Sequence, residues 1–305
     1  MSNKQHSVWF LVALAVGPAC AETPEFNSRP ALPFPDGLSL ESQCGLVDDL
    51  QHVEFYDGSL GIAENYVAQH EKTTVQLQWL TEPEIAAKLP DHAPGNVAGE
   101  RWCTATLVNP TTLLTAGHCF DIGQGEVGWV TPFRFSSNGL PEFAEPEVLA
   151  MLFVANFGYQ LSVQDGAMRD PDVFPVVALK EYRLGGLDYA IVEIGEDNEG
   201  RLPSELNHPV GKTDVRDVSA TELLALIQHP QGDPKKIEAG SARETVGSSI
   251  FYDNIDTHGG SSGSGVRDAD GDVVAVHTNG GCSPSGGGAN RGVLMKSIAS
   301  VSSHF

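Results

Sequence analysis

From residue 53 to the C-terminus, the chain consists of short apolar or alternating runs that turn-forming residues interrupt. Several of these runs alternate, and Gly, Pro, Asn or Asp bound nearly all of them, which is typical of strands. Long periodic helices are few, and residues 62–70 form one plausible short helix. The runs that predict strands are 74–79, 104–108, 174–179, 189–194, 223–227 and 273–276. The pattern therefore predicts an all-β protein, either a sandwich or a barrel.

The N-terminal end has the pattern of a secretory signal peptide. A lysine precedes an apolar run over residues 8–16, and Ala19 and Ala21 are small residues at the two positions that a signal peptidase reads. This predicts a signal peptide over residues 1–21 and a secreted protein, either extracellular or periplasmic. The alternative, lipidation of Cys20, requires a Leu-rich motif that the preceding residues match poorly. No apolar run reaches the ~20 residues needed to span a bilayer, so we expect no membrane association after the signal is removed.

The segment that follows is rich in Pro, Ser and Glu. Because this composition suits neither a helix nor a central strand, we interpret residues 22–52 as a linker or propeptide, with a boundary that extends to about residue 75. Residues 53–305 then form the folded domain. Hydrophobic residues make up 41% of the chain, which is enough apolar material for a full core.

Export would place the later cysteines in an oxidising compartment, where an even number indicates disulfides. These cysteines are Cys44, Cys103, Cys119 and Cys282, and sequence alone leaves their pairing open. The formal net charge is −22, from 40 acidic and 18 basic side chains. Such a charge repels phosphates, so we expect no nucleic-acid partner.

Three segments contain residues that suit nucleophilic catalysis, and their order in the chain is informative. Thr-Ala-Gly-His118-Cys comes first, Asp188-Tyr-Ala-Ile second and Gly-Ser-Ser262-Gly-Ser third. A serine hydroxyl needs a base, and a histidine base needs a buried carboxylate to set its tautomer. An α/β-hydrolase would need the order Ser, acid, His, and no strand–elbow–helix pattern surrounds Ser262. The less favoured alternatives are Asp165, Asp170 and Asp172 for the acid, and Ser261 and Ser264 for the nucleophile.

These segments closely resemble the three signatures of the trypsin/chymotrypsin superfamily of serine peptidases. Residues 227–237 also resemble a strand and loop of its bacterial V8 or glutamyl-endopeptidase branch, and the resemblance covers the chain from about residue 53 to the end. It implies two six-stranded antiparallel β-barrels, few short helices and an active site in the cleft between the barrels. It also implies a secreted serine endopeptidase that acts on proteins or peptides through an acyl-enzyme. We expect a monomer that needs no cofactor.

The resemblance assigns a role to each matching residue. Ser262 would be the nucleophile, His118 the general base and then acid, and Asp188 the orienting carboxylate. The backbone N–H groups of Gly260 and Ser262 would form the oxyanion hole, where the loss of one donor costs about 3–4 kcal/mol. Glycines suit this turn because the backbone must bend sharply to aim both donors at the substrate.

The resemblance also sorts the cysteines. Cys103 and Cys119 match the disulfide that braces the loop of the catalytic histidine. Cys44 and Cys282 are then left to each other, or free; a bridge between them would tether the N-terminal segment near the substrate cleft.

Two features depart from the family's pattern. Gly265 stands where a proline usually follows the nucleophile turn. The stretch from His118 to Asp188 is longer than compact members need, so residues 121–172 are expected to include extra loops that border the cleft.

The substrate pocket would be formed by Asp256 and Thr257 on one side and by His277, Thr278 and Gly280 on the other. In glutamyl endopeptidases a histidine and a hydroxyl hold the substrate carboxylate, and His277 and Thr257 match both. This favours Glu before the scissile bond. In trypsin an aspartate at the position of Asp256 attracts Arg or Lys, which is the alternative, and a broad preference is a third.

Two further hypotheses concern activation and the class of protein. In this superfamily a newly freed N-terminal amine often orders the pocket, so the segment before residue 53 suggests a zymogen. A non-catalytic binding module on the same fold is the alternative from another class, and an esterase with the same triad is a third reading.

No metal site is expected. Asp268-Ala-Asp270-Gly-Asp272 hints at calcium, yet Asp-Gly between two apolar runs is a hairpin signal. Five other histidines show no metal-ligand spacing and are interpreted as ordinary surface or loop residues. They are His52, His70, His92, His208 and His229.

Overall fold

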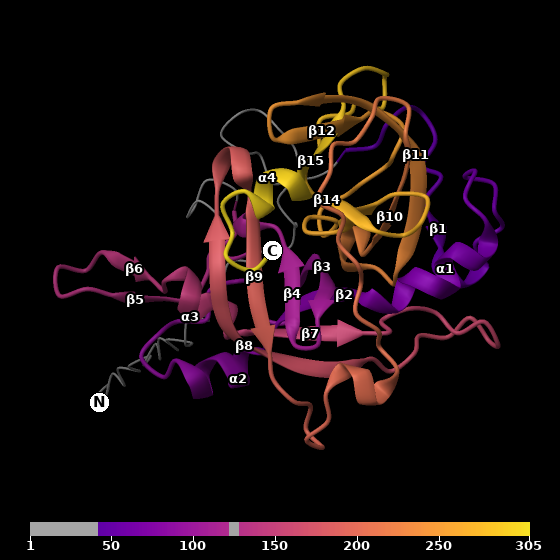
Figure 1. Ribbon diagram of the computed structural model, residues 1–305. Coiled ribbons are helices and arrows are strands. Elements are labelled where there is room, and N and C mark those ends of the chain that lie inside the picture. The colour runs from indigo at the N-terminus through magenta and orange to yellow at the C-terminus, as the bar shows by residue number, and fades with distance from the viewer. Residues whose placement is uncertain (1–41, 122–127) are drawn as a thin grey trace, which may run out of the picture.

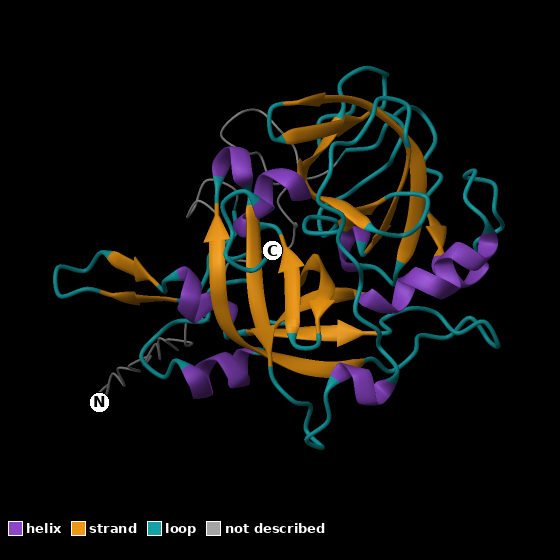
Figure 2. Ribbon diagram, viewed as in Figure 1, coloured by secondary structure: helices purple, strands orange, loops and turns teal. Residues whose placement is uncertain are grey.

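A computed structural model describes residues 42–121 and 128–305, so the predicted signal peptide and most of the predicted linker lie outside the described residues. Strands dominate this part of the chain and form two barrels, shown in Figures 1 and 2. All strand pairings within the barrels are antiparallel. The prediction of two six-stranded antiparallel β-barrels is confirmed.

The first barrel closes in the order β2-β3-β4-β9-β8-β7. Its strands are β2 (Thr74–Trp79), β3 (Arg101–Asn109), β4 (Thr112–Thr115), β7 (Phe153–Phe157), β8 (Asp172–Arg183) and β9 (Tyr189–Ile194). Apolar side chains from all of these strands fill the interior, among them Leu77, Leu107 and Phe174, none of which is exposed. The predicted strands 74–79 and 189–194 match β2 and β9 residue for residue.

The second barrel has the order β11-β10-β13-β14-β15-β12, and pairing of β12 with β11 closes it. Its strands are β10 (Leu223–Gln228), β11 (Lys236–Val246), β12 (Ser249–Tyr252), β13 (Gly265–Arg267), β14 (Val273–Asn279) and β15 (Asn290–Leu294). A two-residue strand, β1 (Gln51–His52), adds to the edge of β11. The core of this barrel is again apolar, with Leu226, Ile250 and Val274 fully buried.

Two apolar clusters join the parts of the molecule. One combines side chains of the first barrel, such as Leu114 and Ile191, with Val276 and Met295 of the second. The other packs residues 53–67 against β10 and β11 before the chain enters the first barrel, which places this N-terminal segment beside the second barrel in Figure 1. The order of the sequence is therefore not the order in space, because the segment that begins the domain covers the barrel that ends it.

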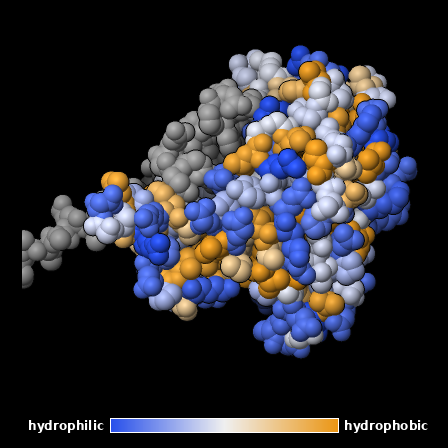
Figure 3. All heavy atoms as spheres, turned by 60° about the vertical axis from the view of Figure 1, so that its left-hand side comes forward, coloured by the Kyte–Doolittle hydropathy of each residue, from blue (hydrophilic) through white to orange (hydrophobic). Residues whose placement is uncertain are grey.

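Helices are few and short, as expected. They are α1 (Glu64–His70), α2 (Glu82–Lys88), α3 (Pro146–Ala150) and α4 (Met295–Ala299), and α1 confirms the helix predicted near residues 62–70. Among the described residues no helix is long and apolar enough to cross a membrane. Hydrophilic and hydrophobic residues are interspersed over the face shown in Figure 3.

The long insertion predicted over residues 121–172 is only partly loop. It contains β7, which is a strand of the first barrel, and a hairpin of β5 (Phe133–Phe135) and β6 (Pro141–Phe143) that projects from the molecule in Figure 1. Residues 122–127 lie outside the described part of the chain.

Candidate active site

Strand pairing brings the candidate histidine and aspartate together. β4 and β9 are antiparallel neighbours, with Thr115 opposite Ala190, so the end of one strand lies beside the start of the other. His118 follows β4 on a short 3-10 turn, η3 (Gly117–Cys119), and Asp188 directly precedes β9. Residues 70 positions apart in the chain thus meet because of barrel topology.

The two side chains form a buried, doubly bonded pair. His118 Nδ1 lies 2.6 Å from Asp188 Oδ2, and the backbone N–H of His118 donates to Asp188 Oδ1 at 2.9 Å. Both residues are buried, with exposed fractions of 4% and 5%. Because a carboxylate only accepts hydrogen bonds, Nδ1 carries the proton, and exchange of a further proton falls to Nε2.

The loop that carries His118 is braced on two sides. Cys103 on β3 and Cys119 form a disulfide, as the resemblance implied, and Trp102 Nε1 donates to the carbonyl of Cys119 at 3.1 Å. Gly117 also packs closely: a Cβ there would lie 2.1 Å from the carbonyl oxygen of Arg183. A glycine is therefore required directly before the histidine.

The Ser262 loop of the second barrel is attached to the first barrel by Thr104. Thr104 N donates to the carbonyl of Ser262 at 2.9 Å, and Thr104 Oγ1 donates to the carbonyl of Gly260 at 2.8 Å. A Cβ on Gly263 would lie 2.9 Å from the backbone nitrogen of Ala116, two residues before His118. The fold therefore places the Ser262 loop beside the segment that leads to His118.

Two glycines determine the backbone shape of this loop. Gly260 and Gly263 flank the serines with positive φ angles of 99° and 88°, which L side chains rarely adopt. The N–H groups of Ser261, Gly263 and Ser264 all donate to carbonyls. Among the described residues, the N–H groups of Gly260 and Ser262 form no backbone–backbone hydrogen bond. These are the two donors that the sequence assigns to the oxyanion hole.

A Gly263→Ala variant should be strongly destabilised. The new Cβ would lie 2.0 Å from Thr115 Oγ1 and 2.2 Å from the carbonyl oxygen of Thr104, at a positive φ. We expect a loss of about 3–5 kcal/mol in the free energy of unfolding, measured by urea denaturation. Gly186→Ala is the matched control, because no atom lies within 4 Å of its Cβ position, and it should change stability by less than about 0.5 kcal/mol. Equal stability of the two variants would contradict this account of the turn.

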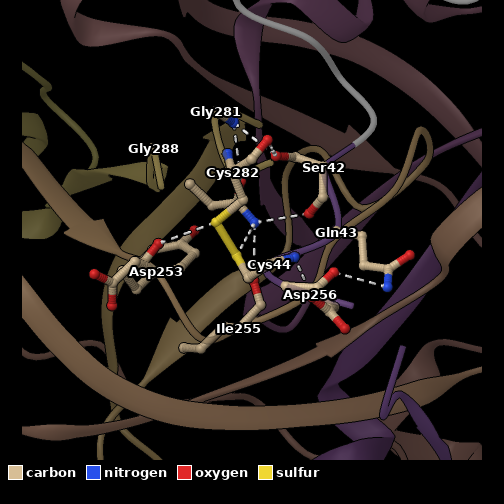
Figure 4. Close-up of a disulfide and its surroundings, with 12 residues drawn as sticks. Ser42, Gln43, Cys44, Asp253, Ile255, Asp256, Gly281, Cys282 and Gly288 are labelled. Carbon is tan, nitrogen blue, oxygen red and sulfur yellow. Dashed lines mark hydrogen bonds between the residues drawn. A yellow bond between two sulfur atoms is a disulfide. The ribbon is translucent and has the colours of Figure 1, made fainter. Parts of the chain in front are cut away.

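A segment that we call the strap, residues 42–49, covers the predicted pocket wall. Ser42 forms a β-bridge with Thr257, and Cys44 forms a disulfide with Cys282, so these two cysteines do pair. The backbone N–H of Cys44 donates to Asp256 Oδ1 at 2.5 Å, and that of Asp49 to Oδ2 at 3.4 Å. Figure 4 shows the disulfide and Asp256 with the strap around them. Both oxygens of Asp256 are thus engaged by the strap.

The other predicted pocket residues lie on β14 or directly after it. His277 is buried on β14, its Nδ1 lies 2.5 Å from the hydroxyl of Tyr252, and burial lowers its pKa to about 3. The backbone of His277 also pairs with the Ser262 loop, since its carbonyl accepts from Gly263 N and its N–H donates to the Ser264 carbonyl, both at 2.8 Å. Thr278 Oγ1 donates to the carbonyl of Arg291 at 3.5 Å, and Gly280 follows the end of β14.

Asn290 organises both walls of the predicted pocket, and the sequence analysis missed it. Its Nδ2 donates to Thr257 Oγ1 at 3.1 Å and to the carbonyl of Ser42 at 3.1 Å. Its Oδ1 accepts from the N–H groups of Gly281 and Cys282 at 2.9 and 3.2 Å. A single asparagine at the start of a strand carries no motif, so only its fully buried contacts reveal this role.

Two histidines that the sequence assigned to the surface or to loops are buried, which corrects the prediction of surface positions. His229 is fully buried because its loop packs under the nucleophile turn, where a Cβ on Gly260 would lie 2.6 Å from the His229 carbonyl oxygen. Burial lowers the pKa of His229 to about 3. His208 is also buried, and its Nε2 lies 2.8 Å from Asp172 Oδ2.

Three clusters of potential metal ligands among the described residues differ in the bonds that their side chains already form. Cys103 and Cys119, which lie beside His118, form a disulfide with each other and therefore provide no thiolate ligands. Asp268 and Asp272 lie at the turn between β13 and β14, where the Asp268 N–H donates to the Asp272 carbonyl at 3.0 Å, so the hairpin prediction is confirmed. A third cluster, around Glu238, is considered below.

Two closed barrels, a buried acid–histidine pair and a glycine-flanked serine loop define the class of β-barrel hydrolases with a chymotrypsin-like fold. The profile of the family described as "Trypsin-like peptidase domain" matches residues 103–276, which is more than half of the chain. The chain therefore belongs to the trypsin-like peptidase family.

Similar solved structures include a Glu endopeptidase in complex with MPD, at 16% identity and a TM-score of 0.49, covering 84% of this chain and 95% of that one. A thermostable serine protease, AL20, from an extremophilic microorganism has 16% identity and a TM-score of 0.49, with coverages of 75% and 94%. A serine endoprotease from Yersinia pestis has 12% identity and a TM-score of 0.48, with coverages of 78% and 64%. No curated protein matches significantly.

Proposed function

We propose that the protein is a secreted serine endopeptidase with His118, Asp188 and Ser262 as its catalytic triad. The observation that carries the proposal is the buried contact of 2.6 Å between His118 Nδ1 and Asp188 Oδ2, which lies beside the glycine-flanked loop of Ser262. Two disulfides agree with an oxidising compartment.

In the proposed reaction, Asp188 keeps the proton of the His118 ring on Nδ1, so Nε2 can act as the base. His118 Nε2 accepts the proton of Ser262 as Oγ attacks the carbonyl carbon of the substrate. The oxyanion that forms is stabilised by the N–H groups of Gly260 and Ser262. His118 then protonates the leaving amine, and water repeats the sequence on the acyl-enzyme.

We propose that the pocket prefers Glu before the scissile bond rather than Arg or Lys. A basic side chain would need to reach the carboxylate of Asp256, but the strap lies over this residue and its backbone N–H groups donate to both carboxylate oxygens. Because Thr257 Oγ1 accepts from Asn290, the hydroxyl proton of Thr257 is left to donate to an anion. The neighbouring imidazole of His277 would supply the second polar group.

A panel of fluorogenic peptides that differ only at this residue should show Glu preferred over Arg by at least about 10²-fold in kcat/KM. The isosteric variant Thr257→Val should reduce that ratio by about 10-fold or more, because a hydrogen bond to a charged group contributes about 1.5–3 kcal/mol. Thr245→Val is the control, since the Thr245 hydroxyl donates to the carbonyl of Val218 at 3.1 Å outside the predicted pocket residues, and it should leave the ratio within about threefold. Preferred cleavage after Arg or Lys would reject the glutamate assignment while leaving the peptidase itself intact.

We further propose that the enzyme is made as a zymogen whose propeptide ends between residues 45 and 75. The strap and residues 53–67 precede the first barrel in the chain but pack on the second barrel. Cleavage within this segment could therefore alter the conformation of the pocket. N-terminal sequencing of the active secreted form tests this, and an active enzyme that starts at Glu22 would exclude it.

A further inference from the structure

Three carboxylates from distant parts of the chain converge beside the strap. They belong to Asp49 at the end of the strap, Glu238 on β11 and Asp256 before Thr257. One oxygen of each lies within 4.8 Å of an oxygen of the other two. Because the three residues are separated by long stretches of chain, their sequence spacing forms no ligand motif.

Glu238 is the feature of this cluster that needs an explanation. The residue is 0% exposed; its Oε1 accepts the N–H of Ala239 at 3.0 Å, whereas Oε2 is buried and has no hydrogen-bond donor among the described residues. Burial above all, and then the charges of Asp49 and Asp256, raise the pKa of Glu238 to about 9. The influence of both aspartates shows that the Glu238 carboxylate faces them. Because its pKa is raised, this carboxyl group is neutralised by a proton at neutral pH unless a cation takes the place of the proton.

The described part of the chain supplies no basic side chain to this cluster. No ion pair links Asp49, Glu238 or Asp256 to a Lys, Arg or His within residues 42–121 and 128–305. The nearby His258 pairs with Asp48 instead, at 3.3 Å.

The second acidic cluster, of Asp214, Asp268 and Asp272, behaves differently. Arg216 Nη2 lies 2.8 Å from Asp268 Oδ2, and Lys212 pairs with Asp272. Within the described residues, basic side chains thus pair with one acidic cluster and not with the other.

We propose that Asp49, Glu238 and Asp256 form a calcium-binding site. Carboxylate oxygens are the ligands that Ca²⁺ prefers, and at about 2.4 Å from the ion two opposite ligands are about 4.8 Å apart, which matches this cluster. Mg²⁺ requires a smaller and nearly ideal octahedron, which ligands from three separate segments are less suited to provide. The N–H groups that hold Asp256 from the strap would orient this ligand.

The site would attach the strap to the second barrel a second time. The disulfide of Cys44 with Cys282 holds one end of the strap, and the ion would hold Asp49 at the other end, next to Thr257. With three protein ligands and water completing the shell, we expect a dissociation constant of about 0.1–1 mM, in the range of extracellular calcium modules. The inference does not depend on peptidase activity.

Thermal unfolding of the chelator-treated protein with and without calcium tests the proposal. At about 10 mM CaCl₂ the Tm should rise by about 3–5 °C, and MgCl₂ at the same concentration should give less than about 1 °C. Using the inactive variant Ser262→Ala prevents self-digestion from affecting the measurement. Isothermal titration with CaCl₂ should show one binding site.

Three variants assign the binding to these residues. Glu238→Gln should abolish the calcium-dependent rise in Tm, and its own Tm without calcium should change little at neutral pH, because Gln replaces a carboxyl group that its raised pKa keeps protonated there. Asp49→Asn changes an exposed side chain, so it should fold normally and also abolish the rise. Asp48→Asn is the matched control, since its neighbour belongs to the cluster and it does not, and it should keep the rise.

Three results would overturn the proposal. The first is a calcium-dependent rise that Glu238→Gln and Asp49→Asn retain. The second is loss of the rise in Asp272→Asn alone, which would place the ion at the other acidic cluster. The third is a Tm that does not change with calcium but falls as the pH increases toward the raised pKa of Glu238. In that case a proton rather than a metal would neutralise the cluster.

Discussion

Replacing Asp188 with asparagine should lower kcat by about 10⁴-fold and leave KM nearly unchanged. Asp188 accepts from both Nδ1 and the backbone N–H of His118, so the carboxylate sets the tautomer and the orientation of the ring. An asparagine amide can donate to Nδ1, which would move the proton to Nε2 and remove the base that Ser262 needs. Steady-state kinetics on a fluorogenic peptide, with the Tm of the variant as a measure of folding, check this result.

The chain offers a close control for this variant. Asp172 also pairs with a buried histidine, since its Oδ2 lies 2.8 Å from His208 Nε2, but the pair lies away from the Ser262 loop. Asp172→Asn should retain activity within about threefold, and it also tests one of the alternative acids. If Asp188→Asn kept more than about a tenth of the activity, Asp188 would not be the orienting carboxylate.

Replacing Ser262 with alanine should lower kcat/KM for peptide hydrolysis by at least about 10³-fold, because no other group would form the acyl-enzyme. The variant should fold normally, since the contacts of Ser262 with Thr104 are made by its backbone. An active-site label that reacts with activated serines should modify the wild-type protein and not the variant, which separates loss of the nucleophile from loss of substrate binding.

The neighbouring serines serve as controls because their hydroxyl groups already bond the loop itself. Ser264 Oγ donates to the carbonyl of Ser261, and Ser261 Oγ accepts from His258 N. Ser261→Ala and Ser264→Ala should therefore lose far less activity than Ser262→Ala. Undiminished hydrolysis by Ser262→Ala would reject the triad and favour a different nucleophile or a binding module.

Strands whose own residues alternate or are uniformly apolar could be predicted from the sequence, and others could not. β2, β9 and β10 read as strands because β-branched and aliphatic residues fill them between turn residues. β13 is only Gly265–Arg267, and its arginine is fully buried, bonding to the Gly271 carbonyl and to Thr73. No local pattern predicts such a strand, because its neighbours in the barrel determine it.

Part of the candidate site could likewise be predicted from the sequence, and part of it could not. The motifs around His118, Asp188 and Ser262 suggested the chemistry because each requires particular residue types within a few positions. The support for the predicted pocket residues Thr257 and His277 came from Asn290 and Tyr252, which no motif marks. The burial of His229 was not predicted for the same reason: contacts distant in the sequence determine it. A polar loop is buried when another loop lies over it.

The sequence by itself determined the strand pattern, the order of histidine, acid and serine, and the residue types needed for acyl transfer, because these depend on neighbours in the chain. Only the tertiary structure decided that Cys44 pairs with Cys282 and that the strap engages both oxygens of Asp256. The contact between Cys44 and Asp256 joins residues 212 positions apart. Such contacts form when the second barrel closes and the N-terminal segment packs on it. The free energy that stabilises this packing comes from the whole core, so the residues next to Cys44 or Asp256 in the sequence do not predict the contact.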